Sequence, residues 1–334
     1  MKYIDDKIIV SKSKKVKKDS LMICIASGSK SHLGKVAYIN DDYNFAFGGF
    51  MGLITPKHEL SSKYLFHLMT SCIYKDFIAE LSDGVNINNL KYDNLKNFLV
   101  PYPNKDEQER IVHKLDEAFE GMAKAKAIAE KNLKNAREVF ESTLEGVFRQ
   151  RGEGWEEKTL DKISENLDSK RIPITKSDRT HGMYPYYGAS GIVDYVDDYI
   201  FDGDTLLVSE DGANLLARST PIAFSVSGKY WVNNHAHILK FENKATQRFV
   251  EFYLESIKLD EYITGAAQPK LNQKALYSIP IPIPMSINMQ AKIVESIELL
   301  SAETQRLGTI YQRKLEALEE LKNSLLEQAF SGEL

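Results

Sequence analysis

Residues 100–108 read VPYPNKDEQ, and residues 281–290 read IPIPMSINMQ. Each stretch places a Pro-x-Pro directly before a long mixed segment, and the two segments align at a constant offset of 182 residues. Ten of the 41 aligned pairs that start at Gln108 and Gln290 are identical. The chain is therefore an internal duplication, and a repeat of this kind sets the architecture before any motif is considered.

The duplication extends upstream of the Pro-x-Pro stretches. Residues 21–28 (LMICIASG) parallel residues 205–212 (TLLVSEDG) at an offset of 184. Each half is thus a mixed domain followed by a long segment of helical character. The second half begins near Trp155, and the position equivalent to Trp155 would lie before Met1. We therefore expect the first mixed domain to be incomplete at its N-terminus.

The two aligned segments have the apolar spacing of a coiled-coil pair. Predicted core positions alternate steps of four and three residues, which is the pattern of a heptad seam. The first seam comprises Ile111, Leu115, Ala118, Met122, Ala125, Ala129, Asn132, Ala136, Val139 and Thr143, and the second comprises Ile293, Ile297, Leu300, Thr304, Leu307, Tyr311, Lys314, Leu318, Leu321 and Leu325. Both seams drift at their polar positions, where the adjacent Leu133 or Leu315 can take over. A single helix of this length, about 60 Å, needs a partner. We predict an intramolecular antiparallel coiled coil, with a long hairpin inside one globular domain as the alternative.

Signals for the ends of helices flank both segments. Asn104 and Ser286 follow the Pro-x-Pro stretches and predict N-caps, and Glu107 adds a carboxylate at the third position of the first helix. Gly152 and Gly332 predict the two C-terminal stops.

Residues 159–284 alternate apolar stretches with Gly, Asp and Asn turns, which is typical of a strand-rich domain. Strands are predicted at 192–196, 205–208, 222–226 and 236–241, and a helix from about Gln247 to Leu259. The fold class is α+β, with two mixed domains separated by two long helices. The predicted division is a first mixed domain at 1–103, a helix at 104–154, a second mixed domain at 155–284 and a second helix at 285–334.

Composition limits the class of protein. The chain has 334 residues, of which 43% are hydrophobic and two are cysteines. These values exclude collagen, a disordered chain and a disulfide scaffold. No apolar run reaches the roughly 18 residues of a spanning helix, and the N-terminus lacks the apolar core of a secretory signal. We expect a cytoplasmic protein that has no membrane partner.

The formal net charge of −4 argues against nucleic-acid binding through bulk positive charge, although a local patch can still bind. One dense basic run is present, formed by Lys12, Lys14, Lys15, Lys17 and Lys18. A solvated loop and a phosphate-contacting loop explain this run about equally well, because clustered lysines repel each other and stay exposed without a partner.

Candidate catalytic and ligand motifs fail on inspection. Residues 28–35 (GSKSHLGK) suggest a phosphate-binding loop, but five residues separate the glycines where the motif has four, and Val36 replaces the magnesium-binding hydroxyl. His235 and His237 could form a metal-binding pair, yet no sequence cluster completes a zinc set, so hydrogen-bonded strand histidines are the simpler interpretation. No cofactor fingerprint, nucleophile elbow or base-methylation loop occurs. We expect no catalytic residue, no cofactor and no metal.

Four strings of the second half resemble a known family. They are YGASGIV at 187–193, DGAN at 211–214, NNHAH at 233–237 and GAAQPKLNQ at 265–273. These strings are similar to those of target-recognition domains in type I restriction-modification specificity subunits. The Pro-x-Pro before Gln290 and the terminal QAFSGEL at 328–334 resemble the spacer regions of the same family. The likeness covers nearly the whole chain in the order domain, spacer, domain, spacer.

The resemblance implies a subunit that recognises a sequence in double-stranded DNA and has no catalytic activity of its own. It also implies assembly with two methyltransferase subunits and, for cleavage, with restriction subunits. Two different recognition domains on a stiff helix pair would address two half-sites at a set separation, so the target would be bipartite and asymmetric with a fixed gap. The alternative is a non-catalytic scaffold whose duplicated domains bind proteins.

Recognition of bases needs donors and acceptors on loops that enter a groove, while lysines set the register by contacting phosphates. The candidate DNA contacts are Lys14, Lys15, Lys17, Lys18, Lys30 and Asn88 in the first domain and Lys170, Arg171, Arg218, Lys229, Lys270 and Gln273 in the second. The strings that resemble the family also contain Asn234, His235, Gln268 and Asn272. We expect these four residues to hold the shape of loops rather than to contact bases.

Overall fold

A computed structural model describes residues 15–43, 45–83, 89–265 and 267–334. The chain divides into two compact units, of which the first comprises Met1–Asn132 and Ile310–Leu334 and the second comprises Leu133–Thr309. Each unit contains one mixed domain and a length of both long helices. Because the division cuts both helices, the domain boundaries proposed from the sequence stay predictions.

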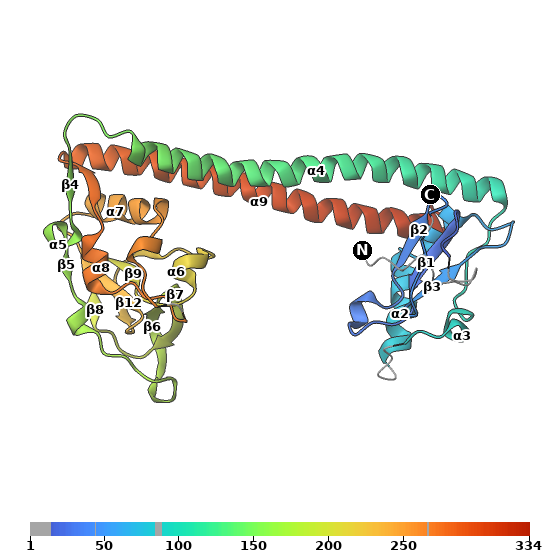
Figure 1. The fold of residues 1–334 in the computed structure, drawn as a ribbon, viewed down its shortest axis with the longest axis horizontal. Helices are drawn as coiled ribbons and strands as arrows, with labels where there is room; N and C mark the ends of the chain where they lie inside the picture. The colour runs from blue at the N-terminus through green and yellow to red at the C-terminus, as the bar shows by residue number, and fades with distance from the viewer. Residues whose placement is uncertain (1–14, 44, 84–88, 266) are drawn as a thin grey trace, which may run out of the picture. The chain divides into compact units, whose positions relative to one another are not determined.

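Two helices of 45 residues each, α4 (Lys105–Arg149) and α9 (Ile287–Ser331), are the longest elements (Figure 1). Both begin at the predicted N-caps, because the side chain of Asn104 accepts a backbone hydrogen bond at 2.9 Å and that of Ser286 accepts one at 3.4 Å. α9 ends before Gly332, whose φ of +89° is the left-handed conformation that terminates helices. Within the described residues, no helix has both the length and the apolar character needed to cross a membrane.

Within each unit, a length of α4 packs antiparallel against a length of α9 (Figure 1). In the first unit, Ile111 and Leu115 near the start of α4 share an apolar core with Leu326 and Phe330 near the end of α9. The second unit has the converse arrangement, in which the end of α4 meets the start of α9 through Leu144, Phe148, Val294 and Ile297. The predicted antiparallel coiled coil within one chain is confirmed.

The predicted seam is wrong at Val139, Thr143 and Leu321, which prove to be exposed. Lys314 is also exposed, and the adjacent Leu315 is half-buried in its place. Leu144 and Leu326 are buried instead, at 5% and 0% exposure. A straight α-helix has about 3.6 residues per turn, so an apolar stripe drifts away from a strict heptad unless the helices supercoil. Near each mixed domain the buried stripe follows the domain rather than the extrapolated heptad.

The described part of the first mixed domain contains a three-stranded antiparallel sheet of order β2-β1-β3. Leu21 and Ile23 alternate along the central strand and are both fully buried, facing a core that includes Tyr64 and Leu68 of the first helix. The elements are β1 (Ser20–Cys24), η2 (Lys30–His32), β2 (Val36–Ile39), β3 (Met51–Ile54), α1 (Ser62–Leu68), α2 (Cys72–Asp83) and α3 (Tyr92–Leu95).

The second mixed domain contains two four-stranded sheets, of order β10-β9-β12-β5 and β7-β6-β11-β8, and the antiparallel pair β13-β4. All five residues of β9 are buried, so this strand is the centre of the domain. The elements are β4 (Trp155–Lys158), α5 (Leu160–Ile163), β5 (Glu165–Asn166), η3 (Asp168–Lys170), η4 (Lys176–Asp178), β6 (His181–Gly188), β7 (Gly191–Val196), β8 (Phe201–Asp202), β9 (Thr205–Ser209), α6 (Asn214–Ala217), β10 (Ala223–Val226), β11 (Lys229–Val232), β12 (Ala236–Lys240), α7 (Lys244–Ser256), η5 (Asp260–Tyr262), α8 (Gln273–Ser278) and β13 (Ile281–Pro284).

The four strands predicted in this domain correspond to β7, β9, β10 and β12. The predicted helix is displaced, because α7 starts at Lys244 and ends at Ser256, three residues earlier at each end. Asn243 causes the early start, since its side chain accepts a hydrogen bond from the backbone of Thr246 at 2.8 Å. The apolar periodicity of this helix becomes clear only after its first turn, so periodicity alone places the start too late.

His67 is expected to make the first unit less stable in mild acid. Its side chain is 5% exposed, and this burial lowers its pKa although a hydrogen bond to Asp116 favours the charged form, while Lys63 and Lys322 oppose that form. As the pH falls through the ordinary value near 6.5, the unfolded state takes up the proton before the folded state does. The free energy of unfolding should therefore decrease as the pH is lowered.

The substitution His67→Gln should remove much of this loss of stability. The measurement is urea unfolding followed by far-ultraviolet circular dichroism at about pH 7.5 and about pH 5.5. The exposed His58 supplies the matched control, since His58→Gln should keep the acid sensitivity of the original chain. Equal acid sensitivity of His67→Gln and the original chain would contradict the prediction.

Candidate nucleic-acid interface

Four loops of the second unit meet at the end of β9 and are held together by hydrogen bonds between their main chains. The amide of Glu210 donates to the carbonyl of His235 at 2.8 Å, and the amide of Leu271 donates to the carbonyl of Glu210 at 2.8 Å. The amide of Asn233 donates to the carbonyl of Tyr187 at 3.0 Å. We call this region the loop junction, and it comprises the described residues of 187–193, 209–214, 233–237 and 265–273. The tertiary structure thus brings together all four strings that resemble the family.

Three glycines give the loop junction its shape. Gly191, Gly212 and Gly265 have φ angles of +125°, +109° and +88°, which residues other than glycine rarely adopt. A Cβ atom at Gly265 would also lie 2.3 Å from the carbonyl oxygen of Gln268. The glycines of these strings are therefore required by the backbone, and they need not contact a ligand.

A group of charged side chains links the loop junction to η3. We call it the charge cluster, and it comprises Asp168, Arg171, Glu210, His237 and Lys270. Arg171 pairs with Glu210 at 2.7 Å, and Lys270 pairs with the same carboxylate at 3.1 Å. Burial opposes ionisation of Asp168, but the hydrogen bonds that it accepts from His237 and from the backbone of Ile238 lower its pKa. The cluster ties η3, β12 and two of the loops into one body.

His237 is the most deeply buried side chain of the charge cluster, with 2% exposure. Its Nδ1 lies 2.6 Å from Asp168, and its Nε2 lies 2.8 Å from the carbonyl oxygen of Leu271. Possible metal-ligating atoms of Asp168, Glu210 and His237 lie within 4.8 Å of one another. Arg171 and Lys270 already pair with the carboxylates, however, so these oxygens have cationic partners without a metal ion. This geometry agrees with the interpretation of His237 as a hydrogen-bonded strand histidine.

The outer face of the loop junction presents polar side chains to solvent. Exposed residues here include Asn234, His235, Gln268, Lys270 and Gln273. His235 contacts Asp211 at 2.9 Å, which orients its ring while leaving the side chain 46% exposed. Amides, an imidazole and an ammonium group are suited to read base edges and phosphates. Asn272 has a structural contact, since its side chain accepts a hydrogen bond from Ala275 at 3.0 Å and caps α8.

The other predicted contacts of the second domain divide into two groups. Lys170 and Lys229 are exposed, and the ammonium of Lys229 lies 4.4 Å from the centroid of the Tyr199 ring. Arg171 belongs to the charge cluster, and Arg218 donates to the carbonyls of Leu254 and Ile257 at the end of α7. Burial lowers the pKa of Arg218. These contacts give both arginines a structural role, and their contact with DNA stays a prediction.

The predicted contacts of the first domain lie on segments that the structure covers only in part. Lys14 and Asn88 fall outside the described residues. Lys15, Lys17 and Lys18 are exposed along the chain that leads into β1, and Lys30 is exposed in η2. These side chains are accessible to a phosphate backbone, and their assignment stays a prediction.

Sequence reasoning missed the two acidic members of the charge cluster, Asp168 and Glu210. Neither residue belongs to a recognisable motif, and Asp168 is separated from its partner His237 by 69 positions. The one available signal was the strand histidine, because a buried imidazole requires an acceptor somewhere in the fold.

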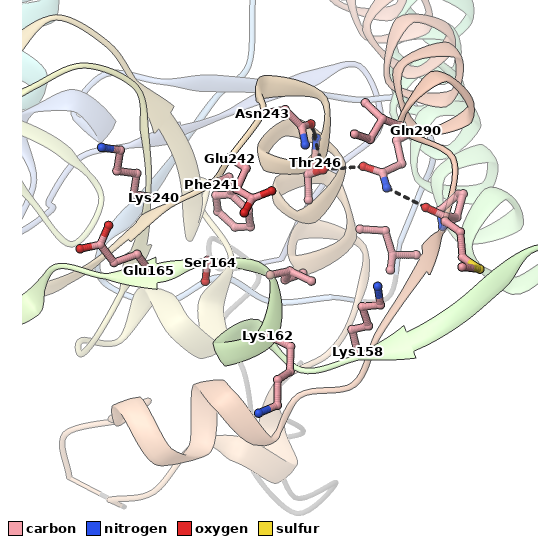
Figure 2. A pocket seen from close by; sticks show the side chains of 15 residues that line it. Lys158, Lys162, Ser164, Glu165, Lys240, Phe241, Glu242, Asn243, Thr246 and Gln290 are labelled. Carbon is pink, nitrogen blue, oxygen red and sulfur yellow. Dashed lines mark hydrogen bonds between the residues drawn. The ribbon is translucent and has the colours of Figure 1, made fainter.

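A pocket of about 520 Å³ lies in a different part of the second unit, where β4, α7 and the start of α9 meet (Figure 2). Its rim carries Lys158, Lys162 and Lys240, but Glu165 and Glu242 lie among them (Figure 2). The pocket is therefore lined by both positively and negatively charged side chains. Since the pocket includes none of the residues of the loop junction, the loop junction remains the better candidate for a nucleic-acid interface.

The family model for the type I restriction modification DNA specificity domain matches residues 4–131 and again residues 152–318. The chain belongs to this family. The double match follows the duplication, with one specificity domain in each half. The loop junction lies within the second match.

Individual specificity subunits show the same relationship. A Haemophilus influenzae protein named as a type I restriction enzyme specificity subunit is 36% identical over 172 residues, which are 52% of this chain and 42% of that protein. The StySPI specificity subunit of Salmonella potsdam is 26% identical over 98% of this chain and 77% of its own length. This chain thus spans less than half of the first relative and about three quarters of the second.

Solved structures support the fold. A structure that concerns complex assembly and conformational transition of a type I R-M system superposes with a TM-score of 0.80 at 16% identity, covering 97% of this chain and 85% of that chain. The HsdS subunit of Thermoanaerobacter tengcongensis superposes with a TM-score of 0.60 at 17% identity, covering 97% and 84%. At this level of identity the likeness concerns the fold, and it agrees with two mixed domains joined by long helices.

Proposed function

We propose that this chain is the DNA-recognition subunit of a type I restriction-modification complex. It reads a bipartite, asymmetric target in double-stranded DNA, and it is itself non-catalytic. Its partners are two methyltransferase subunits, with restriction subunits added for cleavage. The observation that carries the proposal is the match of the specificity-domain model to both halves of one chain.

In this proposal the loops contact the bases, and the long helices set the distance between the two half-sites. The loop junction offers polar side chains on a backbone held by glycines and by the charge cluster, so the backbone that carries these donors and acceptors is held in place before DNA arrives. The paired helices are stiff and of constant length, so they set the gap between the half-sites. The net charge of −4 is compatible with this role if partner subunits supply much of the phosphate neutralisation.

The direct test is selection of DNA from a random pool. The chain would be reconstituted with its methyltransferase partners, and bound duplexes would be sequenced at several salt concentrations. Recovery of a split, asymmetric motif with one gap length is the expected result. Failure to enrich any motif at any salt concentration would refute the proposal and favour a protein-binding scaffold.

Shortening both helices should shorten the gap. Leu133 of α4 lies 3.7 Å from the Cβ position of Gly308 in α9, which sets the antiparallel register. Residues 304–317 of α9 face residues 124–137 of α4 in this register. Removing both stretches deletes two heptads from each helix and preserves the seam. At about 1.5 Å per residue the loss is about 21 Å, equivalent to about six base pairs.

The same selection from a random pool measures the preferred gap. The matched control replaces 124–137 and 304–317 with unrelated heptads of equal length, and it should leave the gap unchanged. An unaltered gap in the shortened protein, with both half-sites still recovered, would show that the helix pair does not set the spacing.

A further inference from the structure

Each mixed domain is joined to its long helix by a buried glutamine at the same position of the repeat. In the first unit Gln108 is fully buried, and its Oε1 accepts from the backbone of Ser61 at 2.8 Å while its Nε2 donates to the carbonyl of Pro103 at 2.9 Å. In the second unit Gln290 is 4% exposed. The two glutamines are an identical pair of the duplication.

Gln290 likewise accepts one hydrogen bond from a helix of its mixed domain and donates one to the Pro-x-Pro (Figure 2). Its Oε1 accepts from the Thr246 hydroxyl at 2.6 Å, and its Nε2 donates to the carbonyl of Pro284 at 2.6 Å. In both units the donated bond goes to the second proline of the Pro-x-Pro. The accepted bond comes from the start of a helix in the mixed domain, from the N-cap residue Ser61 of α1 in one case and from Thr246 in the first turn of α7 in the other.

A carboxylate lies eight residues after each glutamine, again at equivalent positions. Asp116 of α4 pairs with Lys63 at 2.5 Å and with His67 at 2.9 Å, and both partners are on α1. Glu298 of α9 pairs with Arg248 of α7 at 2.9 Å. A separation of eight residues is about two helical turns, or about 12 Å, so both polar contacts lie on one face of the long helix.

Two separated polar contacts constrain a helix in a way that apolar packing does not. Burial of apolar surface is non-directional, whereas hydrogen bonds have narrow preferences in distance and angle. We call Gln108 with Asp116 the first helix clamp and Gln290 with Glu298 the second helix clamp. Each clamp holds α1 or α7 at two points, so it limits rotation of the mixed domain on its long helix.

We propose that the two helix clamps position the mixed domains for DNA recognition, so that Gln108, Asp116, Gln290 and Glu298 are positioning residues that determine how strictly the gap between half-sites is read. This inference rests on the proposed function. A rotation of the domain on its helix displaces the reading loops, and binding of the second half-site depends on how often those loops reach it. A loose clamp therefore permits several gaps at reduced affinity for the best one.

The test uses the isosteric substitutions Asp116→Asn and Glu298→Gln in the complex with methyltransferase subunits. Binding is measured to duplexes that carry both half-sites at gaps from three base pairs shorter to three longer than the preferred gap. Each variant should bind the preferred duplex about tenfold more weakly and accept neighbouring gaps, because the effective concentration of the second half-site falls. The sequence preference within each half-site should not change.

Matched controls remove an exposed carboxylate from the same helix. Glu117→Gln beside Asp116 and Glu295→Gln one turn before Glu298 should retain the original affinity and gap. If Glu298→Gln proves unstable, Arg248→Lys keeps the charge but loses the planar guanidinium, and it should relax the gap in the same way.

The possible outcomes separate this inference from the proposed function. No split motif for the unmodified chain would refute the proposed function itself. A split motif with one gap for the unmodified chain, combined with the same gap and affinity for both folded variants, would refute only the role of the helix clamps. Loss of half-site sequence preference in a folded variant would also refute it, because the residues would then shape the reading loops.

Discussion

Replacing Asp168 by Asn is expected to lower the free energy of unfolding of the second unit by about 3–5 kcal/mol, the usual cost of breaking a buried ion pair. Asp168 is 11% exposed and accepts hydrogen bonds from His237 at 2.6 Å and from the backbone of Ile238 at 2.8 Å. Its removal leaves His237 and Arg171 with one carboxylate, Glu210, in a site from which water is largely excluded.

The measurement is urea unfolding followed by tryptophan fluorescence. The chain has two tryptophans, Trp155 and Trp231, and both lie in the second unit, so the fluorescence reports on that unit. Asp204→Asn, at an exposed position of the same domain, should change the free energy of unfolding by less than about 0.5 kcal/mol. Equal stability of the two variants would show that the charge cluster does not hold the loop junction.

The pH dependence provides a second check on the same residue. The pKa of Asp168 is lowered in the folded state, so its stabilising contribution is present above the ordinary value near 4 and is lost as the pH falls through the lowered pKa. The Asp168→Asn variant should lack this component of acid denaturation.

Phe148→Ala and Phe330→Ala are each expected to cost about 3–5 kcal/mol of stability, the usual cost of truncating a buried phenylalanine. The two residues are aligned in the duplication and occupy equivalent places. Phe148 near the end of α4 packs edge-on against Phe249 and Tyr253, with ring centroids 5.3 and 5.2 Å apart. Phe330 near the end of α9 packs edge-on against Tyr64 at 5.3 Å.

The two substitutions should be distinguishable by the probe that detects them. Phe148→Ala should shift the tryptophan transition of the second unit, and Phe330→Ala should shift the circular dichroism of the first unit with less effect on tryptophan. Phe50→Ala, at a position that is 71% exposed, is the matched control and should leave both transitions unchanged. If all three variants unfolded like the original chain, the ends of the long helices would not be packed on the mixed domains.

The helices were predictable because their signals are local. The Pro-x-Pro stretches, the caps at Asn104 and Ser286 and the stop at Gly332 each act on the turn beside them. Extrapolation of the seam failed at Val139 and Leu321, where packing against a domain decides which face of the helix is buried. The fold class could therefore be predicted from the sequence, but the path of the buried stripe could not.

The candidate site was likewise predictable from the sequence in part only. The four strings indicated the loops. Their glycines Gly191, Gly212 and Gly265 have positive φ angles, which glycine adopts more readily than other residues do. Sequence reasoning placed Arg171 and Arg218 among the DNA contacts, which stays a prediction, and it did not foresee their contacts with Glu210 and with carbonyls at the end of α7. The sequence alone does not show whether a basic side chain faces solvent or a buried carboxylate.

By itself, the sequence determined the duplication, the two long helices with their N-caps, and the family to which the chain is similar, because each of these depends on repeated patterns or on neighbouring residues. Only the tertiary structure decided that Asp168 meets His237 and that the paired glutamines Gln108 and Gln290 hold equivalent helices. These contacts join residues dozens of positions apart. Chain packing decides which polar side chains meet, because a buried donor or acceptor that has no hydrogen-bond partner is destabilising.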